Sequence, residues 1–171
     1  MIHNNKLISF LNNPIIILIY SIILFFIADF FAYFWHRYIS HSNLNIPILK
    51  NIQQSHLKHH TDENDNAIED FMWIIVLILI VSFAVLLLNF IFKLSIYYFV
   101  STLLIGLLVF AINWYVHYSY HTENWLHQYE FFREKVKLHM RHHENINVNY
   151  GITTLYADYL MNSYDDKINE N

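Results

Sequence analysis

Three long apolar runs alternate with polar stretches along the chain. They cover residues 14–35, 71–92 and 94–116. At 1.5 Å per residue, each run is long enough as a helix to cross a hydrocarbon layer about 30 Å thick. The pattern therefore predicts an all-α integral membrane protein, built as a small bundle of about three spans.

The junctions between the runs refine this picture. Lys93 is the only charge near the break between the second and third runs, which predicts a tight helical hairpin that crosses the bilayer and returns. The first run lacks a small-residue cleavage site and passes directly into a pair of histidines. These features favour a spanning helix over a signal peptide.

Histidine is concentrated in the polar stretches that adjoin the apolar runs. Ten of the twelve histidines fall into four groups, and neutral imidazole nitrogen is a strong ligand for transition metals. Ten rings can provide most of the coordination of two ions. The sequence thus predicts a histidine-rich helical cap that holds a dinuclear metal site, with these ligands: His36 and His41; His56, His59 and His60; His117 and His121; His139, His142 and His143. We interpret His3 and His127 as ordinary interfacial or packed residues.

The number of predicted spans allows all ten histidines to lie on one side of the membrane. One span precedes the first two groups, and two more separate these from the last two. Basic residues are concentrated on the same side, which by the positive-inside bias is the cytoplasmic side. Those on the histidine side are Arg37, Lys50, Lys58, Arg133, Lys135, Lys137, Arg141 and Lys167, against Lys6 and Lys93 on the other.

The spacing within each group has a geometric meaning. Residues three and four apart share one face of a helix, with Cβ atoms about 5–6 Å apart, so two such imidazoles can bind one ion. His117 and His121 form a pair of this kind, and each H-x-x-H-H triplet adds a third ring that can serve a neighbouring ion. His36 and His41 are five apart, so the helix is expected to loosen or end between them.

Three polar residues are candidates for orienting the ligand rings. A carboxylate inside a span costs about 2.5–3.5 kcal/mol unless it has a partner, so Asp29 is interpreted as an acceptor for the free N–H of a ligand such as His36. The alternative is a carboxylate that reaches water or Arg37. Asn113, one turn before His117, and Asn149 are candidates of the same kind.

Composition and charge exclude several classes of protein. Hydrophobic residues make up 56% of the chain and charged residues 14%, with two glycines and two prolines, which favours one membrane domain over residues 1–171. The absence of cysteine excludes a disulfide framework, an iron–sulfur cluster and a thiolate-ligated haem. A formal net charge of −4 gives no sign of nucleic-acid binding.

Four segments resemble the fatty acid hydroxylase/sterol desaturase superfamily. The H-x4-H, H-x2-H-H, H-x3-H and H-x2-H-H series is most similar to the fatty acid and sphingolipid 2-hydroxylase branch, and the likeness extends over residues 29–164. The segments are 29–41 (DFFAYFWHRYISH), 56–60 (HLKHH), 117–121 (HYSYH) and 139–158 (HMRHHENINVNYGITTLYAD).

This resemblance implies a function. The ten clustered histidines would ligate two iron ions, with O2 as co-substrate, and the protein would hydroxylate or desaturate an unactivated C–H bond of a membrane lipid. Family members take electrons from cytochrome b5 or a similar donor. No cytochrome b5-like segment occurs here, so a separate donor protein is expected. The implied location is the endoplasmic reticulum or an equivalent membrane, with the metal site facing the cytoplasm.

One segment departs from the family pattern. Where the family often has W-D-x-L-F-G-T, residues 157–163 read A-D-Y-L-M-N-S. Ala157 and Asn162 thus stand in place of a tryptophan and a glycine, and local packing is expected to differ there.

Residue chemistry alone leaves other functions open. Zinc, which purified material could contain, has no redox states and would imply hydrolysis or structure, whereas imidazole-rich iron can activate O2. A non-catalytic membrane metal-binding or transport protein is one alternative, although all ligands lie on one side. A b-type haem electron carrier is another, and the H-H doublets fit it poorly.

Overall fold

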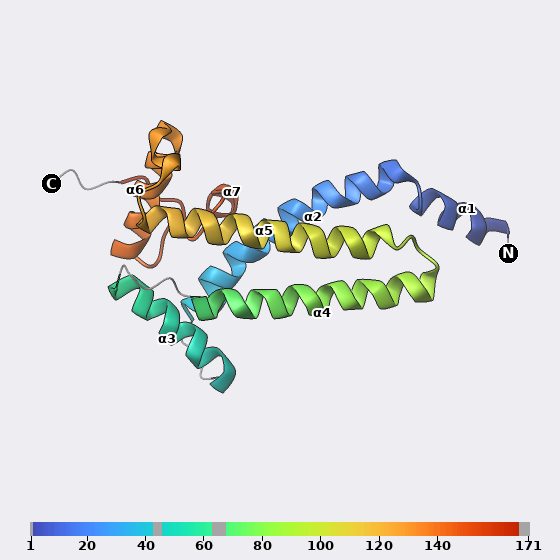
Figure 1. The fold of residues 1–171 in the computed structure, drawn as a ribbon, viewed down its shortest axis with the longest axis horizontal. Coiled ribbons are helices and arrows are strands. Elements are labelled where there is room, and N and C mark those ends of the chain that lie inside the picture. Colours follow the sequence, from blue (N-terminus) through green and yellow to red (C-terminus); the bar gives the residue numbers. More distant parts are fainter. Residues whose placement is uncertain (1, 43–45, 63–67, 168–171) are drawn as a thin grey trace. The chain divides into compact units, whose positions relative to one another are not determined.

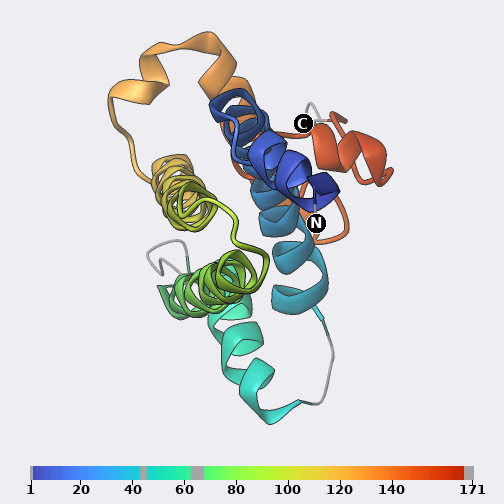
Figure 2. The same cartoon turned by 90° about the vertical axis from the view of Figure 1, so that its right-hand side faces the viewer.

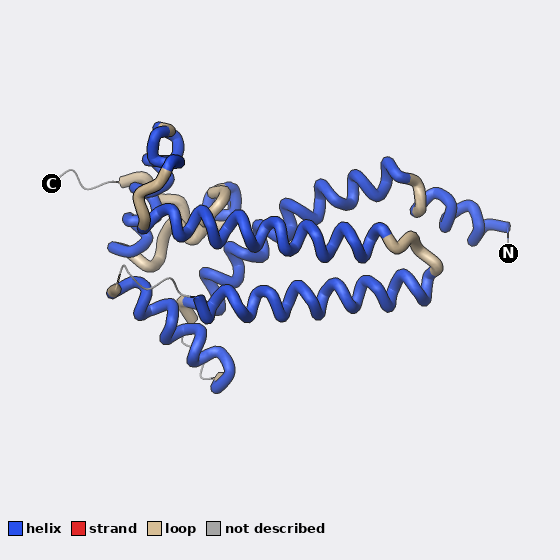
Figure 3. Tube along the Cα trace, viewed as in Figure 1, coloured by secondary structure: helices blue, strands red, loops and turns tan. Residues whose placement is uncertain are grey.

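The structure is a computed structural model that describes residues 2–42, 46–62 and 68–167. It consists of helices joined by loops, and no strand occurs in these ranges (Figures 1 and 3). The predicted all-α class is confirmed. The elements are α1 (Ile2–Leu11), α2 (Pro14–Trp35), the π-helix η1 (His36–Ser40), α3 (Pro47–Thr61), α4 (Ile68–Phe92), α5 (Tyr97–His121), the 3₁₀ helix η2 (Trp125–Gln128), α6 (Glu130–Glu144) and α7 (Tyr156–Leu160).

The described residues fall into two compact units. The apolar unit contains the chain up to Ala28 together with Trp73–Phe110, and the histidine unit contains Asp29–Met72 and the chain from Ala111 onward. Helices α2, α4 and α5 each contribute residues to both units. The single domain predicted over residues 1–171 stays a prediction.

Three helices are long and apolar enough to cross a membrane, as the sequence predicts. They are Pro14–Ser40, Trp73–Phe92 and Tyr97–His121. Large apolar side chains on their surfaces are exposed, including Ile15, Leu79 and Leu104, each of them more than half accessible. Such outward-facing apolar surface is stable when lipid covers it.

The hairpin between α4 and α5 differs in detail from its predicted bounds. Helix α4 ends at Phe92, and Lys93 adopts a left-handed backbone with φ of 55°. The Leu94 N–H then donates to the Asn89 carbonyl at 3.0 Å, which closes the helix end. Helix α5 begins at Tyr97 instead of residue 94, and the Ser95 hydroxyl accepts from the Tyr97 N–H at 3.3 Å in the turn before it.

Hydrogen bonds join α2 to α5 within the apolar unit. The Tyr20 hydroxyl lies 2.6 Å from the Thr102 hydroxyl, and the Ser21 hydroxyl donates to Ser101 at 3.1 Å. In a bilayer no water competes for these groups, so such pairs hold helices together by contacts that lipid cannot replace.

Helices α4 and α5 approach closely where α5 carries a glycine. They run side by side within the apolar unit (Figures 1 and 2), and a Cβ placed on Gly106 would lie 2.9 Å from the Ile78 side chain. Small residues allow this kind of close packing between membrane helices.

The Gly106→Val substitution is therefore expected to destabilise the apolar unit. Overpacking of a well-packed contact costs about 1–3 kcal/mol, so the thermal unfolding temperature in detergent should fall by several degrees. Leu108→Val is the matched control, because Leu108 is exposed on the same helix. An equal shift for both variants would contradict the close-packing argument.

Candidate metal centre

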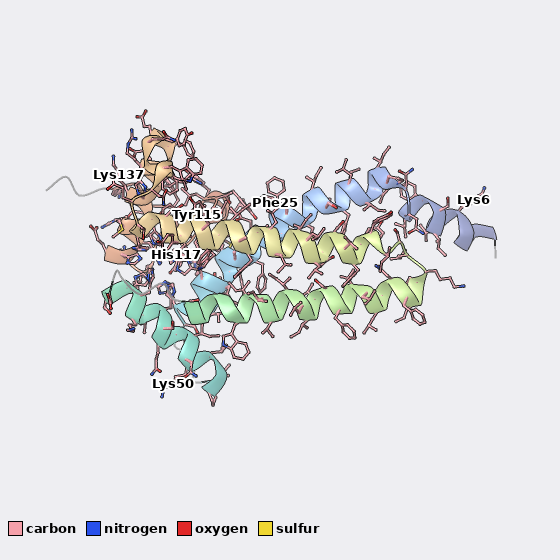
Figure 4. All side chains as sticks on the ribbon, in the orientation of Figure 1. Lys6, Phe25, Lys50, Tyr115, His117 and Lys137 are labelled. Atoms are coloured by element: carbon pink, nitrogen blue, oxygen red, sulfur yellow. The ribbon has the colours of Figure 1, made fainter. Side chains whose placement is uncertain are left out.

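Four elements of the histidine unit supply the clustered histidines. The end of α2 with η1 carries two, α3 three, the end of α5 two, and α6 three. Figure 4 shows His117 on α5 with nitrogen-bearing side chains gathered near it. The rings form two sets of five in which the ligand nitrogens all lie within 4.8 Å of one another: the His36 group (His36, His41, His56, His60 and His142) and the His117 group (His59, His117, His121, His139 and His143).

Each H-x-x-H-H triplet divides its rings between the two groups. On α3, His56 and His60 enter the His36 group, while His59 enters the His117 group. On α6 the division is reversed, because His142 alone enters the His36 group. Helical geometry explains this. Positions i+3 and i+4 both neighbour position i, but they lie on opposite sides of it around the helix, so the i+3 ring can point to one group while the i and i+4 rings point to the other.

The π-helix η1 brings His36 and His41 onto one face although they are five residues apart. The His41 N–H donates to the His36 carbonyl at 3.2 Å, which is the wider i→i+5 turn of a π-helix. Residues five apart thereby reach one face, and the two ring centroids lie 5.0 Å apart. The predicted loosening of the helix between His36 and His41 is confirmed.

The two groups are adjacent. His60 of the His36 group and His143 of the His117 group stack with ring centroids 4.2 Å apart and an interplanar angle of 22°. His59 of one group is likewise 6.0 Å, centroid to centroid, from His56 of the other. The arrangement therefore offers two neighbouring positions for cations, as the sequence predicts for a dinuclear site.

The nitrogen separations fit coordination of an ion by five ligands. In the His36 group, the His41 Nε2 lies 3.2, 3.0 and 3.0 Å from the Nε2 atoms of His36, His56 and His142. In the His117 group, the His139 Nε2 lies 2.8 Å from that of His121 and 3.1 Å from that of His143. Ligands at right angles, each about 2.1 Å from an ion, lie about 3.0 Å apart, whereas tetrahedral ligands lie about 3.4 Å apart.

Hydrogen bonds from one loop fix the tautomer of two ligand rings. The His36 Nδ1 donates to the Tyr150 carbonyl at 2.6 Å, and the His142 Nδ1 donates to the Val148 carbonyl at 2.7 Å. A carbonyl only accepts, so the ring proton is on Nδ1 and the Nε2 lone pair points into the His36 group. Such anchoring of the distal nitrogen is typical of metal-binding histidines.

The rings are held in the neutral form that binds metals. Burial lowers the pKa of His41 to about 2, with further contributions from His36, His60 and His143. Burial likewise lowers the pKa of His60 to about 3 and that of His143 to about 2. At neutral pH these nitrogens are therefore available as ligands.

Asp29 is buried, but it does not orient His36. Its carboxylate accepts from the Thr154 hydroxyl and is hydrogen-bonded to the Asn113 side chain. The predicted pairing of Asp29 with His36 is wrong, because the Nδ1 of that ring is bonded to the Tyr150 carbonyl. The Asp29 carboxylate instead anchors the loop after α6.

Asn113 and Asn149 occupy different positions relative to the rings. Asn113 is buried one helical turn before His117, and its action on a ligand ring stays a prediction. Asn149 has a left-handed φ of 52°, and its side chain binds the backbone of Asp165 (2.9 and 2.7 Å) and the Leu138 carbonyl (3.2 Å). Asn149 thus fixes the loop in which its two neighbours, Val148 and Tyr150, accept from His142 and His36 through their carbonyls.

Sequence reasoning did not single out Asp158. It is fully buried and accepts from the backbone N–H of Tyr150 at 2.8 Å and of Gly151 at 2.7 Å, and from the Ser163 hydroxyl at 2.8 Å. These bonds hold the Tyr150–Gly151 peptide group, whose carbonyl accepts from His36. The position of Asp158 in the segment that matches the family pattern was the available signal.

Ala157 and Asn162, which depart from the family pattern, are both compatible with the local structure. Asn162 has φ of 51°, a left-handed conformation that asparagine tolerates better than most residues besides glycine. Ala157 is buried against Tyr33 and Tyr150, with Phe30 and Tyr156 packed around them. Aromatic side chains from other positions therefore surround Ala157, where the family often has tryptophan.

The two remaining histidines differ in what the structure describes. His127 accepts from the Asn124 N–H at 3.2 Å in the capping box of η2, as expected for an ordinary interfacial or packed residue with a satisfied ring. The side chain of His3 lies outside the described residues.

Acid is expected to destabilise the metal-free protein. The pKa of His41, His60 and His143 lies below the unfolded value of 6.5, so below that pH the unfolded chain binds more protons. Stability is therefore full above about pH 6.5 and falls as pH decreases, by less than about 1.4 kcal/mol per pH unit for each of these half-buried rings, because solvent screens part of the effect. Thermal unfolding between pH 7.5 and 5 measures it, and His143→Gln should give a shallower slope; equal slopes would contradict the assignment.

Comparison with known proteins places these residues in a family. A family model described as fatty acid hydroxylase matches residues 21–163, which include all ten clustered histidines and Asp158. No curated protein and no solved structure gives a significant match. The match covers most of the chain and confirms the superfamily that the histidine series predicts, without assigning a branch. The chain therefore belongs to the fatty acid hydroxylase family.

Proposed function

We propose that this chain is a membrane-bound di-iron oxygenase that acts on C–H bonds of lipids. The observation that carries the proposal is the convergence of ten imidazoles into two groups of five, in a membrane-type chain of the fatty acid hydroxylase family. In hydroxylation, one atom of O2 enters the C–H bond, and the other leaves as water with two electrons and two protons.

The ligand set favours iron over zinc. Structural zinc sites are almost always four-coordinate, and catalytic zinc sites keep three protein ligands, whereas each group here offers five nitrogens. Imidazole ligands suit iron, which when bound would supply the change of oxidation state that O2 activation requires. Zinc in purified protein would then be a substitute ion.

The same count argues against a haem carrier. A haem iron takes four nitrogens from the porphyrin and leaves only two axial positions for protein ligands. Five ligand nitrogens within 4.8 Å of one another leave no space for a macrocycle between them. Metal transport is distinguished by experiment, since a carrier would move ions into proteoliposomes.

Protein residues prepare the site for this chemistry. Burial and mutual repulsion keep His41, His60 and His143 neutral, and the carbonyls of Val148 and Tyr150 aim two rings. His59, His139 and His142 are almost completely buried. Exclusion of water protects reactive oxygen species from quenching and strengthens electrostatic interactions within the site.

A membrane lipid is the proposed substrate. Within the apolar unit, a groove of about 330 Å³ is lined by Ser21, Ile22, Phe25, Phe26 and Ile105, with almost no polar surface. An acyl chain gains about 0.8 kcal/mol for each CH2 that such a surface buries. The groove supports binding of an acyl chain in this part of the protein.

Electrons would come from a separate donor such as a cytochrome b5-like protein. We further propose that the metal site faces the cytoplasm of the endoplasmic reticulum or an equivalent membrane. The excess of lysine and arginine in the segments that carry the histidines supports this orientation.

The function is tested by reconstitution. Protein loaded with iron and supplied with O2, a reducing system and membrane lipid should form hydroxylated or unsaturated product, detected by mass spectrometry. His142→Ala should lower the product yield by more than about 10-fold, since it removes a buried ligand. His127→Ala is the control, because His127 belongs to neither group.

Two results would refute the proposal. Wild-type protein that holds two iron ions yet forms no product with any membrane lipid extract would exclude the oxygenase function. Equal product from wild type and His142→Ala would exclude the histidine groups as its site.

A further inference from the structure

The peptide group between Tyr150 and Gly151 connects a buried carboxylate to a ligand ring. Its carbonyl accepts from the His36 Nδ1–H at 2.6 Å, and its N–H donates to Asp158 Oδ2 at 2.7 Å. The Nε2 of the same ring lies in the His36 group, 3.1 Å from the His56 Nε2. An unbroken chain of hydrogen bonds thus runs from Asp158 to the proposed metal position.

The hydrogen bonds of Asp158 favour its ionised form and oppose burial, which raises the pKa of this carboxyl. One oxygen accepts from the Tyr150 N–H and the Ser163 hydroxyl, both at 2.8 Å, and the other accepts from the Gly151 N–H. Three donors converge on a side chain without solvent exposure. A carboxylate accepts at both oxygens, whereas a carboxylic acid would direct a proton toward one of these donors.

Gly151 is needed for this contact. A Cβ at this position would lie 2.6 Å from Asp158 Oδ2 and would overlap the Thr154 carbonyl. The φ of Gly151 is not positive, so the constraint is close approach and not backbone conformation. The loop therefore brings the carboxylate directly against the peptide group.

A carboxylate that accepts from the N–H of a peptide group changes the strength of its carbonyl as a hydrogen-bond acceptor. Hydrogen bonds in series polarise one another, by perhaps 10–30% per bond in a medium of low dielectric. The carbonyl becomes a stronger acceptor, and a ligand imidazole whose N–H has a stronger acceptor is a stronger base at its other nitrogen. The usual carboxylate–histidine–metal arrangement is thereby reproduced with one peptide group inserted.

We propose that Asp158 is a positioning residue for the His36 group, whose negative charge acts on the bound metal through the Tyr150–Gly151 peptide group and the ring of His36. The inference rests on the proposed metal function. His142 provides a comparison within the same group. Its Nδ1 donates to the Val148 carbonyl, and the N–H of that peptide group, from Asn149, donates to the neutral Ser163 carbonyl at 2.8 Å. Only the His36 path ends in a charge.

The test is the affinity of each position for Co²⁺. Full-length protein in detergent is titrated with Co²⁺ against a chelator, and wild type should bind two ions. Asp158→Asn keeps the shape of the side chain but removes its charge, so one ion should bind about 10–100-fold more weakly while the other is unchanged. Asp165→Asn is the control: this carboxylate is in the same segment, pairs with Arg141 at 3.2 Å, and should leave both affinities unchanged.

A second readout separates the proposed path from a structural role. In the metal-free protein, Asp158→Asn should move the ¹⁵N resonance of the His36 Nδ1 more than that of the His142 Nδ1. If Asp158→Asn fails to fold, Ser163→Ala serves instead. It removes one donor from the carboxylate without removing the charge, so it should tighten the same ion, by less than about 10-fold.

Each outcome has a defined meaning. Selective weakening of one ion with the resonance shift at His36 supports the inference. Unchanged affinities in Asp158→Asn, equal loss of both ions, or weaker binding in Ser163→Ala would overturn it, while the proposed function stands. Wild-type protein that binds no Co²⁺ would overturn the proposed function together with the inference.

Discussion

The histidine unit depends on one electrostatic constraint, the convergence of nitrogen lone pairs in a buried space. The Nε2 atoms lie 2.8–3.2 Å apart, and His36 and His142 carry their protons on Nδ1, so these two rings turn only lone pairs toward the nitrogens that face them. Protonation is no remedy, since burial holds the pKa of His41, His60 and His143 far below neutral pH. A cation satisfies all five nitrogens of a group at once, so the folded arrangement is itself the strongest argument for metal binding.

Four elements suffice to bring ten rings together, because one helix can contribute rings to both histidine groups. Each triplet directs its i and i+4 rings to one group and its i+3 ring to the other, and α3 and α6 do so in opposite senses. The single pairs complete the sets, with His117 and His121 from a regular helix and His36 and His41 from a π-helix. The stacked rings of His60 and His143 then keep the two groups in contact.

Much of this arrangement could be predicted from the sequence, because helical periodicity is local. The bounds of α2, the pairing of His117 with His121 and the loosening after His36 all follow from spacing along one segment. The predicted start of α5 is three residues early, because Leu94 and Ser95 form a turn held by hydrogen bonds, which hydropathy does not mark. The acceptors for His36 and His142 were also missed, since they are backbone carbonyls, which every residue carries and no pattern of side chains marks.

The loop after α6 shows which departures from a family pattern a metal site can tolerate. Asp158 is retained, residue 163 keeps a hydroxyl that binds it, and Asn162 replaces glycine at a left-handed position. Asp158 binds the N–H groups of Tyr150 and Gly151, on either side of the carbonyl that accepts from His36. Ala157, in contrast, packs in the aromatic cluster with Tyr33 and Tyr150. Loss of a large side chain there changes packing volume, while the hydrogen bonds that reach the rings remain intact.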